Sequence, residues 1–307
     1  MAVPSNTYVT SSAVGIYENL HKAVTNIDPV DKILLNSIDE YDDEVTQTKQ
    51  EWTIDSLRAS ASNAHDEGDD TTTQAITAAV RRYNIQQIFK ESFRLSGSIQ
   101  KANAPSGLTK EAYQTTKKLK ELSKDIERGC WRGVRNDTDT RQMRGILNWL
   151  TTNLSMDAGA TLNADGTVSG GANRALTPDM IKEVSHNCYN RGGKPDTLVC
   201  TTTQAGKISD FANLGNYRQM VEGGKLNDYV DVYRTETGTY KTKIHRDFPT
   251  DVIAIMEWEY WKKATWRPTR KEPLSKTGDS DRWHIVCEMT VVALQEASSG
   301  RIVNLEN

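Results

Sequence analysis

The most regular pattern of apolar positions lies between residues 107 and 132. Lysines and acidic residues fill most positions there, and the apolar residues recur at spacings of three, four and four: Leu119, Leu122, Ile126 and Cys130. This spacing places the apolar side chains in one stripe along an α-helix. At about 1.5 Å per residue, the helix would be roughly 30–35 Å long. The sequence therefore predicts a long helical rod with a narrow apolar seam.

Alternating apolar and polar positions on either side of a polar segment predict a long hairpin. Trp52 and Ile54 alternate with polar residues in EWTIDSLRAS, and Tyr83 and Ile85 do the same in AVRRYNIQ. Such alternation, with aromatic and β-branched residues, is typical of half-buried strands. The segment 60–75 between them is acidic and contains Gly, which is typical of a turn or loop. We therefore expect two strand-like arms with an exposed tip at EGDDTTT.

The second half of the chain combines helix signals with short apolar runs. Thr177 is suited to the N-cap of a helix and Pro178 to its first turn. The run DTLVC then predicts a short buried strand and TTTQAGKISDFANL a second helix, so an α/β layer is expected here. After Tyr229 the pattern predicts a hairpin that turns near Gly238, followed by further strands. The Gly-, Ala- and Asn-rich segment 157–175 is expected to be a loop.

Residues 1–50 are polar and show little sustained periodicity, so they are expected to form an extended arm that lies on another surface. The whole chain has 307 residues, 36% of them hydrophobic, and a formal net charge of −3. This length suffices for a core, and the small net charge argues against general attraction to nucleic acid or anionic membrane. The sequence shows no signal-peptide pattern, and its apolar runs are far shorter than the roughly 20 residues of a membrane span. No membrane partner is therefore predicted.

The cysteines are scattered along the chain without a CxxC pair: Cys130, Cys188, Cys200 and Cys287. This distribution favours reduced, structural thiols over a disulfide framework. A zinc cluster would need closer pairs of ligands, so we predict no metal site of this kind.

The polar stretch SNAHDEGDDTTTQ gathers one histidine and four acidic residues: His65, Asp66, Glu67, Asp69 and Asp70. A metal or acid/base site would need such groups on rigid elements, whereas here they share one polar loop. The stretch also lacks the ligand spacing of a calcium-binding loop. A solvated loop is the favoured interpretation, and an ion site is the alternative.

Sequence motifs for catalysis are not found. YNRGGKP and VEGGKL contain Gly-Gly-Lys but do not match a phosphate-binding loop, and no GxSxG, HExxH or GxGxxG occurs. The prediction is therefore a protein that is not an enzyme and has no cofactor. Basic clusters occur at Arg81–Arg82 and in WRPTRKEPLSKTGD, but acidic neighbours in the second cluster favour ion pairing or a solvated face over nucleic-acid binding.

The predicted arm, hairpin and rod each have too little contact with themselves to be stable alone. Neighbouring copies in a symmetric assembly would supply the missing surface. At this point the chain resembles the major capsid proteins of tailed bacteriophages, which have the Hong Kong ninety-seven-type fold. The stretches that carry the resemblance cover most of the chain from about residue 50: EWTIDSLRAS; DEGDD; RRYNIQQIFKESFRLSGS; LKELSKDIERG; RGGKPDTLVC with TTTQAGKISDF; and TWRPTRKEPLSKTGDSDRWHIVCEMTVVALQEASSGRIVNL.

The resemblance implies an α+β capsid fold with five segments. These are an N-terminal arm, an extended loop that laps onto a neighbour, a peripheral domain with a spine helix, an α/β axial domain, and a return to the peripheral β-sheet: residues 1–50, 51–100, 101–149, 150–250 and 251–307. The spine helix would be residues 107–132. The chain begins too close to the loop to hold a long N-terminal scaffolding segment, so the resemblance implies a separate scaffolding protein, or none. We predict no covalent cross-link between subunits.

The implied function is that of a structural subunit that assembles with itself into hexamers and pentamers of an icosahedral phage head. The head would enclose double-stranded DNA, touched non-specifically, and would assemble in the host bacterial cytoplasm as part of the virion. A portal and a scaffolding protein are expected partners, with a decoration protein as a further option. An uncharacterised cytosolic enzyme or a nucleic-acid-binding protein remains the alternative.

Candidate inter-subunit contacts come from the extended loop, its base and the strand that follows. They are Trp52, Arg58, Glu67, Asp69, Asp70, Arg81, Arg82 and Arg94.

Overall fold

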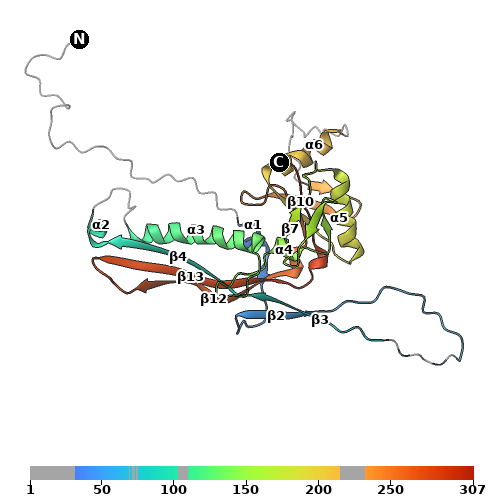
Figure 1. Ribbon diagram of the computed structural model, residues 1–307, viewed down its shortest axis with the longest axis horizontal. Helices are drawn as coiled ribbons and strands as arrows, with labels where there is room; N and C mark the ends of the chain where they lie inside the picture. The colour runs from blue at the N-terminus through green and yellow to red at the C-terminus, as the bar shows by residue number, and fades with distance from the viewer. Residues whose placement is uncertain (1–31, 69, 71–72, 74, 103–109, 215–231) are drawn as a thin grey trace, which may run out of the picture.

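The computed structural model describes most of the chain in six stretches: residues 32–68, 70, 73, 75–102, 110–214 and 232–307. Three parts follow one another along the molecule: a long sheet covered by α3, a module of mixed helices and strands, and a loop that projects from the body (Figure 1). Residues 1–31 of the expected arm, and the expected contact Asp69, lie outside the described residues.

The long sheet has four strands in the order β1-β12-β13-β4. Their bounds are Asp39–Glu40, Trp261–Leu274, Ser280–Ala293 and Gln87–Ser96. The expected helical rod is confirmed as α3 (Glu111–Arg132), which lies along one face of this sheet (Figure 1). The short helix α2 (Gly97–Lys101) follows β4, and the Ser96 hydroxyl caps it by accepting from the Ile99 amide.

The buried face of α3 differs from the predicted seam at one position. Leu122, Ile126 and Cys130 are buried as expected, but Leu119 is 39% exposed. One turn before Leu122, Lys118 lies toward the sheet instead and forms a 3.0 Å ion pair with Glu91 of β4. At 100° per residue Leu119 lies within the angular span of the same stripe, so its exposure reflects the turn of the contact toward Lys118 at this end of α3.

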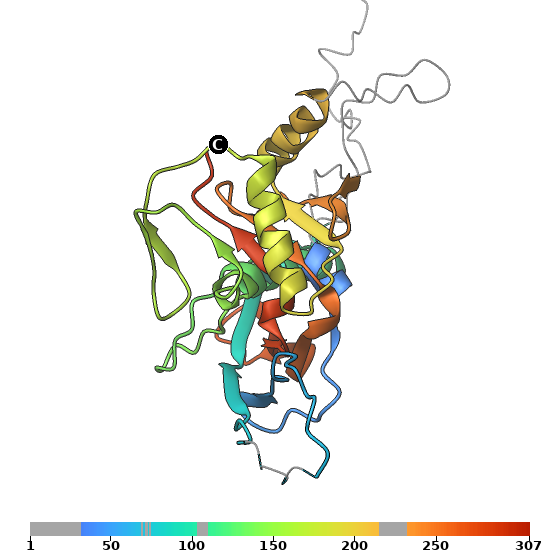
Figure 2. The same cartoon turned by 90° about the vertical axis from the view of Figure 1, so that its right-hand side faces the viewer.

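The second module is built on a six-stranded sheet in the order β5-β14-β11-β8-β10-β9. The bounds in that order are Leu154–Ser155, Gly300–Ile302, Ile253–Met256, Thr197–Cys200, Thr239–Ile244 and Val232–Arg234. Its helices α5 and α6 are Pro178–Asn190 and Thr202–Leu214. The predicted helix–strand–helix order is confirmed, and all of β8 is buried. Figure 2 shows α5 crossing in front of this sheet.

The segment 157–175 is more ordered than the expected loop. It contains an antiparallel pair, β6 (Ala160–Leu162) and β7 (Val168–Gly170). Its turn has Gly166 at φ +86°, a conformation that glycine adopts without strain. The composition that suggested a loop therefore marks the turn and the ends of a small hairpin.

Two hydrophobic cores meet at β11. Ala254 and Met256 belong to the core that includes α3, α4 (Ile146–Trp149) and the long sheet. The alternating residues Ile253 and Ile255 belong to the core beneath α5 and α6. Since successive strand residues point to opposite faces, one short strand joins both cores.

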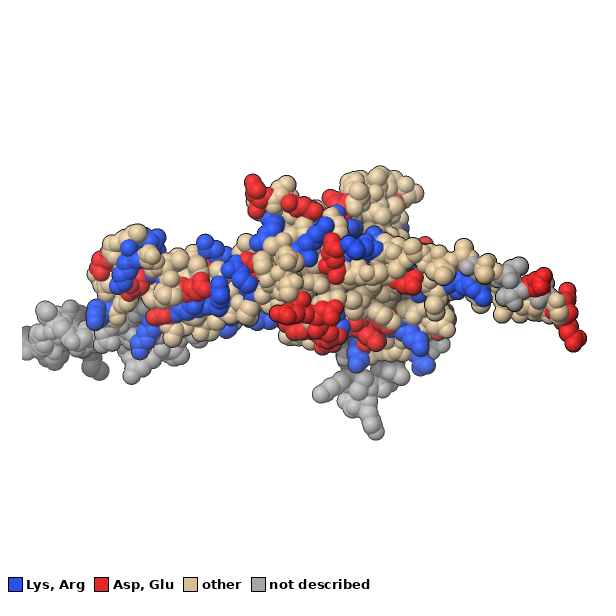
Figure 3. Space-filling model, turned by 90° about the horizontal axis from the view of Figure 1, so that it is seen from below, with Lys and Arg blue, Asp and Glu red and all other residues tan. Residues whose placement is uncertain are grey.

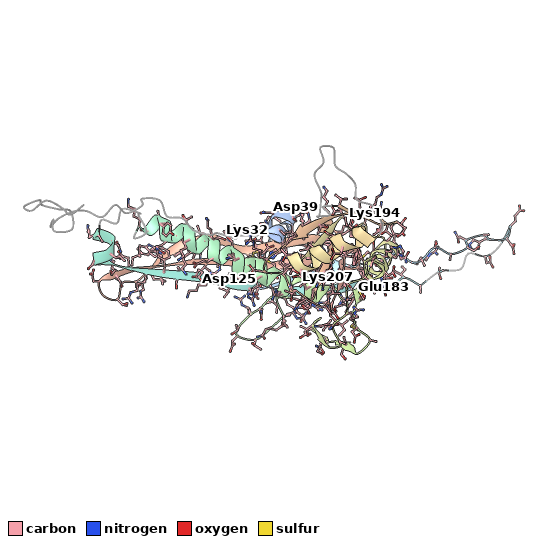
Figure 4. All side chains as sticks on the ribbon, turned by 90° about the horizontal axis from the view of Figure 1, so that it is seen from above. Lys32, Asp39, Asp125, Glu183, Lys194 and Lys207 are labelled. Atoms are coloured by element: carbon pink, nitrogen blue, oxygen red, sulfur yellow. The ribbon has the colours of Figure 1, made fainter. Side chains whose placement is uncertain are left out.

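The remaining elements connect these parts. They are α1 (Ile33–Ser37), the strands β2 (Lys49–Ile54) and β3 (Val80–Ile85), and the short 3₁₀ helices η2 (Trp258–Tyr260) and η3 (Glu296–Ser298). Lys32 and Asp39, which flank α1, lie where α3 meets the second module (Figure 4). Among the described residues, no helix combines the length and the apolar character that crossing a membrane requires.

Candidate inter-subunit surfaces

The base of the extended loop is fixed to the body of the same chain. Strands β2 and β3 pair antiparallel from Lys49↔Ile85 to Ile54↔Val80. Trp52 is only 6% exposed, and its ring lies 5.5 Å from that of Trp149, tilted by 55°. Trp52, which the sequence suggested as an inter-subunit contact, therefore lies in the chain's own core and anchors the loop there.

Asn84 forms a second anchor that the sequence pattern did not single out. Its side chain is fully buried, and its amide nitrogen donates to the carbonyls of Arg144 (3.0 Å) and Val291 (2.8 Å). Its amide oxygen accepts from the Arg144 backbone N–H at 2.8 Å. Because buried polar groups are costly unless paired, these bonds hold β3 at one position on the body.

The paired strands of the extended loop are shorter than expected. The pairing of β2 and β3 stops at Ile54, and every described residue from 55 to 79 is exposed. Leu57 is 99% exposed and Ile76 is 97% exposed. Exposing two large aliphatic side chains to water is unfavourable, and burial against another protein surface would stabilise them. These two residues, one on each limb of the loop, were not predicted as contacts.

The polar residues suggested on the loop are also exposed. Glu67 and Asp70 lie in the middle of the loop sequence, and Arg58 donates to the neighbouring Ala59 carbonyl at 3.2 Å. His65 lies 3.0 Å from the Asn63 side-chain oxygen. In the described part of the chain, no group of three His, Cys, Asp or Glu residues is placed to hold a metal ion.

Arg81 and Arg82 lie on β3, at the base of the loop. Arg81 contacts Glu51 across the strand pair at 3.3 Å. Arg82 lines a cleft of about 170 Å³ together with Arg144 and Trp149. Burial, reinforced by neighbouring arginines, lowers the pKa of Arg144 from its ordinary value. Asp55 and Glu296 also line the cleft, so its wall combines basic, acidic and aromatic side chains.

Arg94 lies in a different place from the other candidates. It belongs to the part of β4 next to α2, which is at the opposite end of the molecule from the loop (Figure 1). Its Nε donates to the Ser280 hydroxyl at 2.7 Å. The structure thus brings Trp52, Arg81 and Arg82 together at the loop base and leaves Arg94 far from them.

A buried polar junction joins three elements that are distant in sequence. Glu127 of α3 is 1% exposed and accepts from the Leu34 and Leu35 amides of α1 at 2.7 and 3.0 Å. It also accepts from the Trp131 indole at 3.2 Å, and His245 Nε2, at the end of β10, lies 3.3 Å away. No sequence motif indicated this junction, because its members are more than 90 residues apart for α1 and α3.

The cysteine prediction is confirmed, since all four thiols are free and buried. Burial raises the pKa of Cys188 and of Cys200 to about 12, and it raises the pKa of Cys130 and Cys287 as well. Thiols that stay protonated near neutral pH are inert, as expected of packing residues.

The family model of the SU10 major capsid protein matches residues 3–306. The chain belongs to this family. A curated major capsid protein of Escherichia phage Phieco32 is 25% identical over 293 residues, covering 80% of this chain and 82% of that protein. This SU10-type major capsid protein therefore forms a phage shell. The resemblance stated from the sequence is confirmed.

Solved structures agree on the fold. The capsid asymmetric unit of cyanophage A-1(L) matches with a TM-score of 0.68 and 12% identity, over 97% of this chain and 98% of that one. The capsid of a native GTA particle matches with a TM-score of 0.65 and 12% identity, over the same shares. The α+β capsid fold class expected from the sequence is thereby confirmed.

Proposed function

We propose that this SU10-type capsid protein is the repeating structural subunit of an icosahedral head, assembled as hexamers and pentamers around double-stranded DNA. The observation that carries the proposal is the loop with Leu57 and Ile76 almost fully exposed on a base fixed by Trp52 and Asn84. A rigid base with an uncovered apolar loop suits a segment that is completed by a neighbouring copy.

In this proposal the parts have distinct roles. The long sheet and α3 form the peripheral domain, the six-stranded module forms the axial domain near the ring centre, and residues 51–100 lap onto a neighbour. Residues 1–50 form an arm along the shell, and 251–307 return to the peripheral sheet. The α1 segment fixed to Glu127 supports an arm that leaves the body at a defined point.

The subunit acts without catalysis, and its partners are copies of itself, a portal and a separate scaffolding protein. A decoration protein is a further option, and packaged DNA is touched non-specifically. Assembly takes place in the host bacterial cytoplasm. The buried, protonated thiols support a structural role over an enzyme that uses a cysteine nucleophile, which is one form of the enzyme alternative.

Electron microscopy of the purified protein, with size-exclusion chromatography alongside, tests this function. We expect closed shells, or rings of five and six subunits, alone or with a co-expressed scaffolding protein. A protein that stays a monomer or dimer at high concentration under both conditions would contradict the proposal and reopen the enzyme alternative.

A further inference from the structure

The face of the long sheet that points away from α3 carries a row of basic side chains without an ion pair to any of the described residues. Phe89 contacts α3 at Gly129, and Glu91 pairs with Lys118 of α3, so these two residues of β4 point toward the helix. Strand alternation then places Lys90 and Arg94 on the opposite face. Both are exposed.

The neighbouring strand adds a third cation to the same face. Arg282 of β13 is the direct cross-strand partner of Arg94, and side chains of such partners share a side of the sheet. Like charges placed opposite each other are unfavourable unless an anion lies between them or nearby. Arg94 and Arg282 are held instead by bonds to Ser280 and to the Ser275 carbonyl (2.9 Å). We call Lys90, Arg94 and Arg282 the basic strip.

The carboxylates on this face are already occupied. Glu288 is contacted by Arg267 and, at 3.7 Å, by Arg141, while Glu272 is contacted by Arg270 (2.9 Å) and His284 (2.9 Å). None of the three cations of the basic strip forms an ion pair with any residue that the structure describes. Figure 3 shows Lys and Arg side chains on this underside of the sheet, with acidic side chains among them.

The opposite end of the molecule carries the complementary charge. Asp66, Glu67 and Asp70, which we call the acidic tip, are exposed on the described part of the loop. In Figure 3 acidic side chains lie at the far end of the projecting loop, at the opposite end of the molecule from the long sheet. Because the loop projects away from the body, the acidic tip is placed to meet another copy instead of its own sheet (Figure 1).

We propose that the acidic tip of one copy binds the basic strip of a second copy. This inference rests on the proposed function, and it names the surface onto which the loop laps. One donor and one acceptor surface at opposite ends of each chain give a head-to-tail contact, the kind that closes into rings. Ile88, 47% exposed on the same face of β4, and the exposed Leu57 and Ile76 supply apolar area beside the charges.

This apolar component favours a protein over DNA as the occupant. Proteins that bind duplex DNA non-specifically rely on many lysines and arginines without anionic neighbours, often with a strongly basic domain. Here Lys90 and Arg94 alternate with Ile88 and Ser92 along β4, and Arg282 of β13 is the third cation, in a chain with a net charge of −3. A mixed strip of this kind matches a loop that carries both carboxylates and aliphatic side chains.

Charge reversal in the full chain tests the inference. Arg94→Glu with Arg282→Glu should lower the yield of closed shells roughly tenfold or more at physiological salt, since like charges at an interface cost several kcal/mol. Lys124→Glu with Arg128→Glu, the same change on the outer side of α3, should leave the yield unaltered. Asp66→Lys with Glu67→Lys and Asp70→Lys should reduce the yield as the first variant does. Thermal unfolding checks that every variant folds.

Combining both reversals in one chain gives the decisive comparison. Each interface then has exchanged but complementary charges, so assembly should return toward the wild-type yield. The inference is overturned if Arg94→Glu with Arg282→Glu assembles like wild type, or if the combined chain, correctly folded, assembles no better than either reversal. Normal shells of the first variant with weaker retention of duplex DNA would identify the strip as a DNA contact instead. Failure of the wild-type chain to assemble would count against the proposed function, a separate result.

Discussion

His245 Nε2 lies 3.3 Å from Glu127 Oε1 in the interior, where both side chains are 1% exposed. The Asp247 amide donates to His245 Nδ1 at 3.1 Å, which leaves Nε2 as the ring nitrogen that faces Glu127. Glu127 thereby joins α3 to β10, and through the amides of Leu34 and Leu35 it also fixes α1. A single buried carboxylate holds the point where the two modules and the described end of the arm meet.

Glu127→Ala should strongly destabilise the unassembled subunit. The change leaves two backbone amides and the Trp131 indole without their acceptor in a buried site, so we expect a loss of about 3–5 kcal/mol in unfolding free energy. Urea unfolding of the subunit measures this. Glu121→Ala, which removes only exposed pairs with Lys117 and Lys118, should cost less than about 1 kcal/mol. Equal losses in both variants would refute the junction's role.

Trp52→Ala should destabilise the fold by removing the loop's anchor. Large-to-small changes of a buried Trp cost about 3–5 kcal/mol, and here the lost contact includes Trp149. The unfolding midpoint in urea should fall accordingly. If this variant kept wild-type stability but failed to assemble, Trp52 would act between subunits, as the sequence had suggested.

Leu57→Ser with Ile76→Ser should leave stability within about 0.5 kcal/mol of wild type, because these side chains contact water in the isolated chain. Shell yield should fall sharply, since the loop loses the apolar area that a neighbour covers. Electron microscopy and unfolding, measured on the same preparation, separate the two effects. Leu57→Met with Ile76→Val keeps the apolar surface and should assemble. Equal shell yields from the serine variant and this control would contradict the prediction.

The four thiols should resist alkylation in the folded protein. With the pKa of Cys188 and Cys200 raised to about 12 by burial, almost no thiolate exists at pH 8. A raised pKa keeps the protonated form up to high pH, so reactivity should rise only when pH approaches 12 or when the protein unfolds. Mass spectrometry after iodoacetamide treatment should find none of the four modified in buffer and all four in urea. Rapid labelling of one cysteine in the folded protein would show that this thiol is accessible and contradict the prediction.

Gly166→Ala should be more damaging than Gly192→Ala, although both glycines have φ near +87°. A Cβ at Gly166 would lie 1.9 Å from the Asn148 carbonyl oxygen, whereas at Gly192 nothing lies within 4 Å. The Gly166 carbonyl also accepts from the buried Arg301 guanidinium at 2.6 Å. We expect about 1 kcal/mol of backbone strain at Gly192 and at least about 3 kcal/mol in total at Gly166, measured by thermal unfolding. Similar losses at both positions would mean that the β6–β7 turn moves aside readily.

Local patterns were sufficient for most of the regular elements. The apolar repeat in α3, the buried run of β8 and the proline that opens α5 each depend on neighbours within a few residues, so sequence alone locates them. Where a pattern was incomplete, the prediction was less accurate. Leu119 lies at the end of its stripe and is exposed, and the glycine-rich segment 157–175 folds into a hairpin because distant residues such as Arg301 hold its turn.

The candidate site was accessible to the sequence only in part. Composition placed Glu67 and Asp70 on an exposed loop and the order of the motifs indicated a capsid protein, because both depend on chain order. The place of Trp52 in the core could not be predicted, since an alternating aromatic residue suits a core and an interface equally until Trp149 is placed against it. The Glu127 junction and the opposition of Arg94 to Arg282 exist only after strands and helices far apart in sequence are packed together. The sequence determined which elements form and what kind of protein this is, and the tertiary structure decided which side chains anchor the fold and which remain for a neighbour.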